Sequence, residues 1–389
     1  MTGRERLINI FKRKKVDRVP VCPWLHVNII YKYFNVAPEE QNWRKIGDIV
    51  LPEMALEAEE HFGIDHFYRS AYPRHQCDEK SSSNGKWIVN AVFKKINGRD
   101  TEITTIKTPE KELRQVKEFD QTSRFTYIEA IREYFIKEKG DFDQFVKYQP
   151  SFDEAIYPAI IDEFMGIDRA KKAFGDKGII VGEINGAFNS LNVYRNLELI
   201  MMDPYTDPGF YKAMIEYFSN RSISSIRKMV KHGADVIEMA GNLATSCVGE
   251  KFFSSFVLEH ERAIVEEIKK LGAYSLYHNC GDAAKIMHLY NDMGIDAWGY
   301  MTPPPYGDVD FDEALKVINK DIILMGNIDQ VNFLIKATPK QVKKKVRETL
   351  EKIKERGNFI LSTTDWCFDD TPFENIVAFA EAGIKYGKY

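Results

Sequence analysis

Short runs of apolar and β-branched residues recur along the chain and are separated by longer segments with helical periodicity. Eight of these runs are strand candidates: Val19–Pro23, Asp65–Tyr68, Gly178–Ile184, Val236–Met239, Tyr274–Cys280, Ala297–Met301, Ile322–Ile328 and Phe359–Thr363. Strands that alternate with helices predict βα units and a parallel sheet. Eight such strands predict an α/β fold of the (β/α)8 type, a TIM barrel.

The spacing of apolar residues predicts helices between these strands. Pro208–His232 and Phe253–Leu271 both repeat apolar residues at close to 3.6-residue spacing. A further helix is predicted from Thr338 to Arg356, because Pro339 suits a first helical position and Gly357 suits a stop.

One long segment, residues 69–177, interrupts the alternation between the second and third predicted strands. It is expected to hold a hairpin and two helices: Lys86–Phe93 paired with Thr101–Thr108, then Tyr127–Glu138 and Tyr157–Phe174. Loops that follow barrel strands lie at the C-terminal mouth, so this insertion is expected to cover the mouth. We therefore expect a single barrel domain over residues 1–389, with the insertion as its lid or as a substrate wall.

Composition narrows the class of protein. The 389 residues are 44% hydrophobic and 29% charged with a net charge of −4, which is typical of a globular protein without a basic field for nucleic acid. No apolar run approaches the roughly 18 residues of a membrane helix. Five scattered cysteines do not form a disulfide framework. The sequence thus predicts a cytoplasmic protein whose reduced thiols are free to bind metal.

The strongest chemical signal is His278-x-Cys280 together with the distant Cys367. Residues i and i+2 of a strand point to one face, so His278 and Cys280 can reach the same ion. Both lie at the end of the fifth predicted strand and Cys367 follows the eighth, so all three are expected at the mouth. One imidazole and two thiolates suit zinc with an open fourth position, the arrangement of a catalytic site. Cys22 and Cys247 are alternative thiol ligands.

Three more residues are catalytic candidates. Glu238 ends an otherwise apolar strand, where an unpaired carboxylate is expensive to bury. It is expected to ligate zinc reversibly, to orient the substrate, or to accept a hydrogen bond from His278; a solvated carboxylate is the alternative. His26 and Asn28 follow the first predicted strand and are expected to point toward the mouth.

Further side chains at predicted strand ends are candidates for a substrate wall. Trp24, Tyr300 and Trp366 supply aromatic surface, and Asn185 and Asn327 supply hydrogen-bonding groups. Packing within the barrel is the alternative explanation for the aromatic residues.

At these residues the chain resembles the uroporphyrinogen decarboxylase superfamily, in its zinc-dependent, corrinoid-linked methyltransferase branch. The pattern His278-x-Cys280 with a distal Cys367 is similar to the zinc motif of methylcobamide:thiol methyltransferases. The resemblance extends over most of the chain. Its other matching stretches are Arg4–Leu7, Val16–Val21, Gly233–Asp235, Gly326–Asp329 and Thr371–Ile376. The resemblance implies a zinc ion, a corrinoid (cobalamin) carried by a cognate partner protein, and a homodimer as one option.

The chain also departs from the family. Decarboxylases of the family carry arginines after the first strand for the substrate carboxylates, whereas Pro23–Ile30 has none. Gln330 replaces a proline common after Gly326–Asp329, and the 69–177 insertion is absent from the compact coenzyme M enzymes. Decarboxylation is therefore disfavoured.

The resemblance and the predicted zinc site together indicate a methyltransferase that moves a methyl group between a small substrate and the cobalt of a corrinoid protein. The favoured substrate is a methoxylated aromatic, because the insertion and the aromatic residues suggest a large, walled pocket. A methylcobamide:thiol methyltransferase is the first alternative. A decarboxylase-like lyase and a non-catalytic corrinoid-binding barrel are alternatives of other classes.

Overall fold

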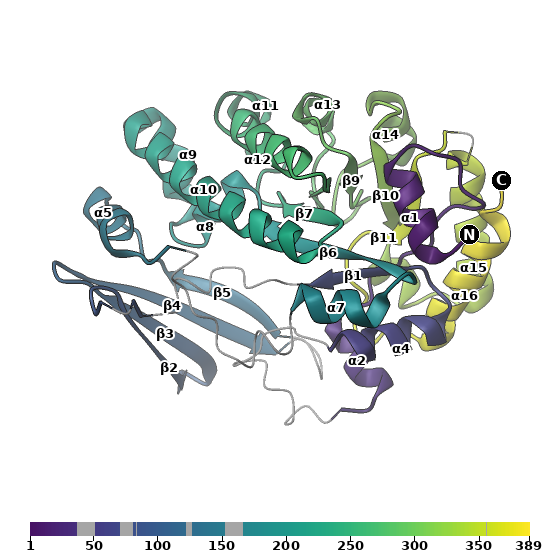
Figure 1. The fold of residues 1–389 in the computed structure, drawn as a ribbon, viewed down its shortest axis with the longest axis horizontal. Coiled ribbons are helices and arrows are strands. Elements are labelled where there is room, and N and C mark those ends of the chain that lie inside the picture. Colours follow the sequence, from purple (N-terminus) through teal and green to yellow (C-terminus); the bar gives the residue numbers. More distant parts are fainter. Residues whose placement is uncertain (37–50, 71–80, 83, 122–126, 152–165, 355) are drawn as a thin grey trace.

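A curled parallel sheet surrounded by helices forms the body of the protein (Figure 1). The computed structural model describes residues 1–36, 51–70, 81–82, 84–121, 127–151, 166–354 and 356–389. Seven strands follow one another around the sheet in chain order. They are β1 (His66–Ser70), β6 (Gly178–Asn185), β7 (Val236–Ala240), β8 (Tyr274–His278), β9 (Ala297–Gly299), β10 (Ile323–Ile328) and β11 (Phe359–Thr363). The prediction of a TIM-barrel-like α/β fold is confirmed.

The predicted first strand, Val19–Pro23, is an extended segment rather than a regular strand. It lies between β11 and β1, because the amide of Cys22 donates to Leu361 (2.8 Å) and the amide of Asp65 donates to Val21 (2.8 Å). The amide of Leu361 returns a bond to Pro20 (2.9 Å). Prolines at both ends of the segment lack the amide hydrogen that a continuous ladder needs. The segment nevertheless bridges the two outer strands of the curled sheet.

Alternation along the strands separates two hydrophobic cores. Inward positions form the barrel interior: Phe67, Ile179, Val181, Val236, Leu276, Ala297, Ile323, Met325 and Ile360. Helix α1 (Gly3–Phe11) closes one end of this interior with Leu7, Ile10 and Phe11. Phe11 stacks on Tyr274, the first residue of β8, so the closed end is the N-terminal end of the strands. The opposite, C-terminal end is left for the site.

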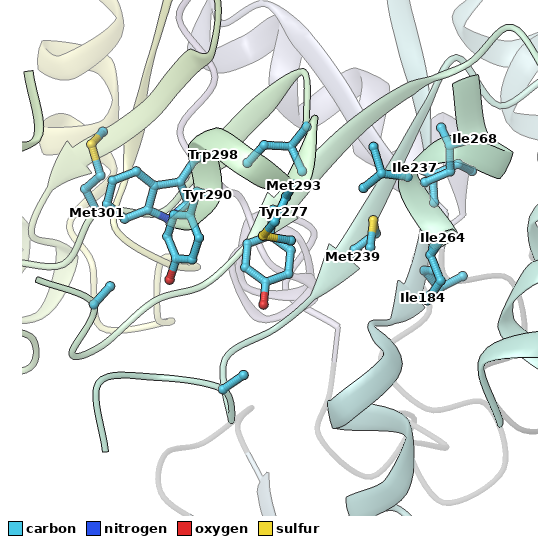
Figure 2. Close-up of a cluster of buried hydrophobic side chains, with 14 of the residues drawn as sticks. Ile184, Ile237, Met239, Ile264, Ile268, Tyr277, Tyr290, Met293, Trp298 and Met301 are labelled. Atoms are coloured by element: carbon cyan, nitrogen blue, oxygen red, sulfur yellow. The ribbon is translucent and has the colours of Figure 1, made fainter. Parts of the chain in front are cut away.

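Outward positions of the same strands pack beneath the surrounding helices. Figure 2 shows this outer core between β6–β9 and the following helices, with Ile237, Met239, Tyr277 and Trp298 among its side chains. The neighbouring inward positions, 238 and 278, therefore face the barrel interior. This alternation is what places Glu238 and His278 on one surface.

The helices that cover the barrel are mostly short. Their bounds are α2 (Val27–Tyr33), α4 (Pro52–Phe62), α7 (Ile167–Phe174), α8 (Ala187–Asn192), α9 (Leu197–Thr206), α10 (Pro208–His232), α11 (Glu250–Phe252), α12 (Leu258–Lys270), α13 (Tyr290–Met293), α14 (Phe311–Val317), α15 (Pro339–Ile353) and α16 (Phe373–Tyr386). Within the described residues, no helix combines the length and the apolarity that crossing a membrane requires.

The insertion contains a four-stranded antiparallel sheet instead of a lone hairpin. Its strands, in spatial order, are β2 (Ile88–Ile96), β3 (Arg99–Lys107), β4 (Glu112–Gln121) and β5 (Tyr127–Glu133). The predicted hairpin exists, with Asn97 and Gly98 both at positive φ (51° and 83°) in its turn. Such values are those of the two-residue turns that match the twist of paired strands.

The predicted helix Tyr127–Glu138 is wrong. Residues 127–133 form β5, which pairs with β4, and the helix of this region is α5 (Lys139–Tyr148). The segment has apolar residues at both helical and strand spacing, and the available edge of β4 decides between them. Of the predicted helix Tyr157–Phe174, the part from Ile167 is α7, and residues before 166 lie outside the described part of the chain.

The insertion contacts the chain that leaves the C-terminal end of β6. The side chain of Gln115 donates to the carbonyl of Val193 (2.8 Å), just beyond α8. Phe142 of α5 meets Phe210 and Phe218 of α10 edge-on or tilted, at 5.9 and 6.2 Å between ring centroids. In Figure 1 the antiparallel sheet lies beside the barrel, below α8–α10. These contacts support the proposal that the insertion forms part of the wall of the mouth.

Candidate metal centre

Charged side chains extend the inner core at the C-terminal ends of three strands. Arg69 follows Phe67 on β1, Glu238 follows Val236 on β7, and His278 follows Leu276 on β8. Each charged residue is two positions beyond an interior apolar residue, so it points to the same side of its strand. Three polar groups thus meet where the apolar interior ends.

His278 has its two ring nitrogens in different situations. Nδ1 lies 2.9 Å from Oε1 of Glu238. Nε2 is buried, and within the described residues it has no hydrogen-bond partner of acceptable geometry. A carboxylate that accepts from Nδ1 fixes the proton there and leaves the lone pair of Nε2 available, which is how metal-binding histidines are commonly oriented. Of the roles expected for Glu238, the hydrogen bond to His278 is present.

Glu238 is held from its other side by Arg69. Nε of Arg69 donates to Oε2 of Glu238 (2.8 Å), and another guanidinium nitrogen donates to the hydroxyl of Tyr300. Burial alone would raise the pKa of Glu238, but the charge of Arg69 and the hydrogen bond from His278 outweigh it and lower the pKa to about 2. The carboxylate is therefore ionised although its side chain is 2% exposed.

The candidate metal ligands meet around His278. Ligand atoms of His278, Cys280 and Asp365 all lie within 4.8 Å of one another. The thiol of Cys280 donates to Oδ2 of Asp365 at 3.7 Å. Burial would lower the pKa of His278, but Cys280 and Glu238 raise it well above its ordinary value. Negative groups that gather around one imidazole form a favourable environment for a cation.

The structure places the third predicted ligand, Cys367, next to this group but not within it. Cys367 is fully buried, and its amide donates to the carbonyl of Trp24 (2.8 Å). Burial raises the pKa of its thiol to about 12, against a hydrogen bond with Thr363 that lowers it. Asp365, two residues earlier, takes the corresponding place in the cluster.

Aromatic rings line one side of the centre; their predicted role as a substrate wall stays a prediction. The ring of His278 lies 4.7 Å from that of Tyr300 and 5.4 Å from that of Trp24. Trp366 lies 5.8 Å from Trp24, and His26 lies 4.5 Å from Trp366. The hydrogen bond from the Trp24 amide to the Thr363 hydroxyl (3.1 Å) ties this wall to the end of β11.

The remaining predicted site residues do not join the cluster. Asn28 is 1% exposed and lies in the first turn of α2. Asn185 and Asn327 are half-buried at the ends of β6 and β10. Their roles in substrate binding stay predictions.

The alternative thiols lie elsewhere. Cys22 belongs to the barrel interior and burial raises its pKa well above the ordinary value. Cys247 is exposed and close to the hydroxyl of Thr245 (2.8 Å). Cys77 lies outside the described residues.

Two residues of the centre, Arg69 and Asp365, were missed from the sequence. Arg69 is the i+2 neighbour of the interior residue Phe67, so continuing the predicted second strand by one residue would have found it. Asp365 precedes Cys367 by two residues, directly after the last strand. A carboxylate at a strand end beside predicted ligands was the available signal for it.

An α/β barrel with a candidate zinc centre at its C-terminal mouth is the class that fold and site define. The family profile of uroporphyrinogen decarboxylase (URO-D) matches residues 140–386, well over half of the chain. The chain belongs to the uroporphyrinogen decarboxylase family. The expected placement in the methyltransferase branch of that superfamily is confirmed by its relatives.

Several relatives are named as methyltransferases, and one as a uroporphyrinogen decarboxylase. The chain is 24% identical to the methylated-thiol–coenzyme M methyltransferase of Methanosarcina mazei, over 56% of either protein. It is 23% identical to the methylcobamide:CoM methyltransferase of Methanosarcina acetivorans, over 66% of this chain and 71% of that protein. A solved methyltransferase from M. mazei shares the fold, with a TM-score of 0.66, 18% identity and 99% coverage of both chains.

Proposed function

We propose that this protein is a zinc-dependent methyltransferase that moves a methyl group between the cobalt of a partner corrinoid protein and a small thiol. The observation that carries the proposal is the cluster of His278, Cys280 and Asp365, whose ligand atoms lie within 4.8 Å of one another, together with the buried Nε2 of His278, which has no hydrogen-bond partner in the described structure. The names of the relatives supply the corrinoid and the thiol.

The donor set fits zinc. Imidazole nitrogen, thiolate sulfur and carboxylate oxygen are all zinc ligands, at about 2.0–2.3 Å from the ion. Ligand atoms around one such ion lie about 3–4 Å apart, compatible with the 3.7 Å between Cys280 and Asp365. We propose His278 and Cys280 as ligands, and either Asp365 or Cys367 as the third.

The identity of the third ligand is testable with two matched variants. If Cys367 ligates zinc, Cys367→Ser weakens zinc affinity far more than Asp365→Asn does. If Asp365 ligates it, the order is reversed. Zinc affinity of each purified variant, measured by competition with a chromophoric chelator, separates the two cases.

Bound zinc would lower the pKa of a substrate thiol and keep its sulfur nucleophilic. The protein's own groups prepare that position. Glu238 accepts from Nδ1 of His278, which leaves Nε2 as the nitrogen for the ion. Trp24, Tyr300 and Trp366 form an apolar wall that limits water near the reacting atoms.

The choice of a thiol revises the substrate that the sequence favoured. A methoxylated aromatic was preferred for its fit to a large aromatic-walled pocket. The relatives act on thiols by their names, and this favours the thiol. The methoxyarene stays as a second candidate because the rings of Trp24, His26 and Trp366 could stack on an aromatic substrate.

The test is a methyl-transfer screen with the zinc-loaded protein. Methylcobalamin is offered with a panel of thiols, and Co(I) cobalamin is offered with methoxyarenes, while the cobalamin absorption spectrum is followed. We expect zinc-dependent demethylation of methylcobalamin by a thiol. Turnover of methoxyarenes alone would favour O-demethylation, and the absence of methyl exchange with either set would contradict the proposal. A homodimer and a dedicated corrinoid partner stay predictions.

A further inference from the structure

Arg69 is a buried cation in the centre, and no ligand role explains it. Its side chain is 8% exposed. The guanidinium carbon lies 4.0 Å from the centroid of the Trp24 ring and 4.8 Å from that of Phe67. Nε donates to Glu238 at 2.8 Å, and another nitrogen donates to the Tyr300 hydroxyl. Packing and hydrogen bonds together hold the guanidinium in one orientation.

This fixed guanidinium sets the orientation of the carboxylate that it contacts. Glu238 uses Oε2 for Arg69 and Oε1 for Nδ1 of His278, so its two oxygens are divided between two donors. The Glu238 side chain is 2% exposed, which leaves little room for water to replace either donor. The orientation of His278, on β8, therefore depends on a group in β1, with β6 and β7 between the two strands in the sheet.

We propose that Arg69 is a positioning residue of the metal centre, which holds Glu238 so that His278 presents Nε2 to the ion. This inference rests on the proposed function only in requiring that the site binds zinc. Arg69 acts through Glu238 and touches neither the ion nor the substrate. Outer partners of this kind typically contribute ~10–100-fold to metal affinity.

Direct binding of an anionic substrate group is the competing role for Arg69. The geometry argues against it, because Nε and a terminal nitrogen are already engaged and the side chain is almost fully covered. A guanidinium that recognises a substrate anion normally keeps its paired donors for that anion.

The test uses three variants of the full-length protein. Arg69→Met keeps an unbranched apolar stem but removes the donors and the charge. Arg69→Met/Glu238→Gln also removes the buried negative charge, while Oε1 of glutamine can still accept from Nδ1 of His278. Arg69→Lys keeps the charge without the fork of donors. Zinc affinity is measured by chelator competition, and the protonated nitrogen of His278 by ¹⁵N NMR of the metal-free protein at a pH above the raised pKa of the imidazole.

We expect Arg69→Met to weaken zinc affinity by ~10–100-fold and to leave the proton of neutral His278 spread over both ring nitrogens. The double variant should stay about as weak, because it also lacks the guanidinium that holds the side chain at 238. Arg69→Lys should fall between wild type and Arg69→Met. If Arg69→Met proves insoluble, the zinc affinity of the double variant alone tests the inference. The double variant is expected to fold because it leaves no buried charge without a counter-ion.

Wild-type zinc affinity in Arg69→Met, or a double variant that recovers wild-type affinity, would overturn this inference. A double variant that binds zinc normally but transfers no methyl groups would assign Arg69 to the substrate instead. Failure of the wild-type protein to bind zinc would overturn the proposed function itself, so the two failures are distinguishable.

Discussion

Two buried arginine–carboxylate groups lie at opposite ends of the barrel, and they differ in how completely their polar atoms are used. At the N-terminal end, Asp65 directly precedes β1 and its side chain is 3% exposed. It accepts from Arg6 (2.5 Å), from Arg18 (2.6 and 3.0 Å) and from the amide of Val21 (2.8 Å). This cluster joins α1, the extended segment and β1.

At the C-terminal mouth, Arg69 and Glu238 form a similarly buried pair, and Glu238 also contacts Nδ1 of His278. Nε2 of His278 has no hydrogen-bond partner within the described structure. Burying a polar atom without a partner costs folding free energy. Such an atom is therefore expected where an ion or a ligand binds it. We call the group around Asp65 the saturated cluster and the group of Arg69, Glu238 and His278 the unfinished cluster. The saturated cluster stabilises the fold, and the unfinished cluster is the candidate site.

Loss of a ligand at the unfinished cluster should have the largest effect. Cys280→Ser is expected to lower zinc affinity by more than the ~10–100-fold of an outer partner and to abolish methyl transfer, with little change in unfolding free energy. Chelator competition and the cobalamin assay measure the first two, and urea denaturation the third. Cys247→Ser, which changes an exposed thiol, is the matched control. Equal zinc affinity in both variants would remove Cys280 from the centre.

Loss of the carboxylate at the saturated cluster should have the opposite profile. Asp65→Ala leaves Arg18 without its buried counter-ion and removes one of the two carboxylates that Arg6 contacts, the other being Asp17. We expect it to lower the free energy of unfolding by about 3–5 kcal/mol, while the folded fraction binds zinc normally. A variant with lost zinc affinity and unchanged stability would erase the distinction between the two clusters.

Glu261 tests whether an unpartnered buried oxygen is sufficient to make a site. It lies in α12 and is fully buried; Oε1 accepts from the amide of Phe188 (3.4 Å), and Oε2 has no partner within the described residues. No His or Cys ligand joins it in a candidate metal cluster. Burial raises its pKa from 4.5 to about 7, although amides of Ala187 and Phe188 act against this.

A pKa raised on folding means that the folded state keeps the proton of Glu261 where the unfolded state has lost it. The unfolding free energy should therefore fall as pH rises from 4.5 to about 7, by about 3 kcal/mol in total. Glu261→Gln should remove this contribution. Denaturation curves of both proteins across that range measure the difference, and parallel pH profiles would contradict the assignment.

The smallest effect is expected where an ion pair of the N-terminal end meets solvent. Arg4 donates to both oxygens of Asp235 (2.7 and 2.6 Å), but its side chain is 32% exposed. Arg4→Ala should cost about 1 kcal/mol of stability, because solvent screens the pair. A loss as large as that of Asp65→Ala, measured under the same conditions, would show that burial does not separate these pairs.

The barrel was largely predictable because its strands obey local rules. Gly178–Asn185 and Phe359–Thr363 are nearly continuous apolar runs, as parallel strands buried on both faces should be. Residues 127–133 were not predictable in this way, since their pairing with β4 is a long-range contact that overrides local preference. The same applies to Val19–Pro23, whose hydrogen bonds go to distant segments.

The site was predictable only in part for a related reason. The i, i+2 spacing placed His278 and Cys280 together from sequence alone. The contacts of Arg69 with Glu238 and of Asp365 with Cys280 join different strands and depend on side-chain orientation in three dimensions. Cys367 has the right position along the chain, yet in the structure the carboxylate two residues before it meets Cys280.

The central claim is that zinc binds between His278 and Cys280 at the mouth. Zinc-edge X-ray absorption of the wild-type protein, loaded with one equivalent of zinc, tests it most directly. We predict a mixed shell with sulfur at about 2.3 Å and nitrogen or oxygen at about 2.0–2.1 Å, and weaker sulfur scattering in Cys280→Ser. A shell of nitrogen and oxygen alone in the wild-type protein would contradict the account.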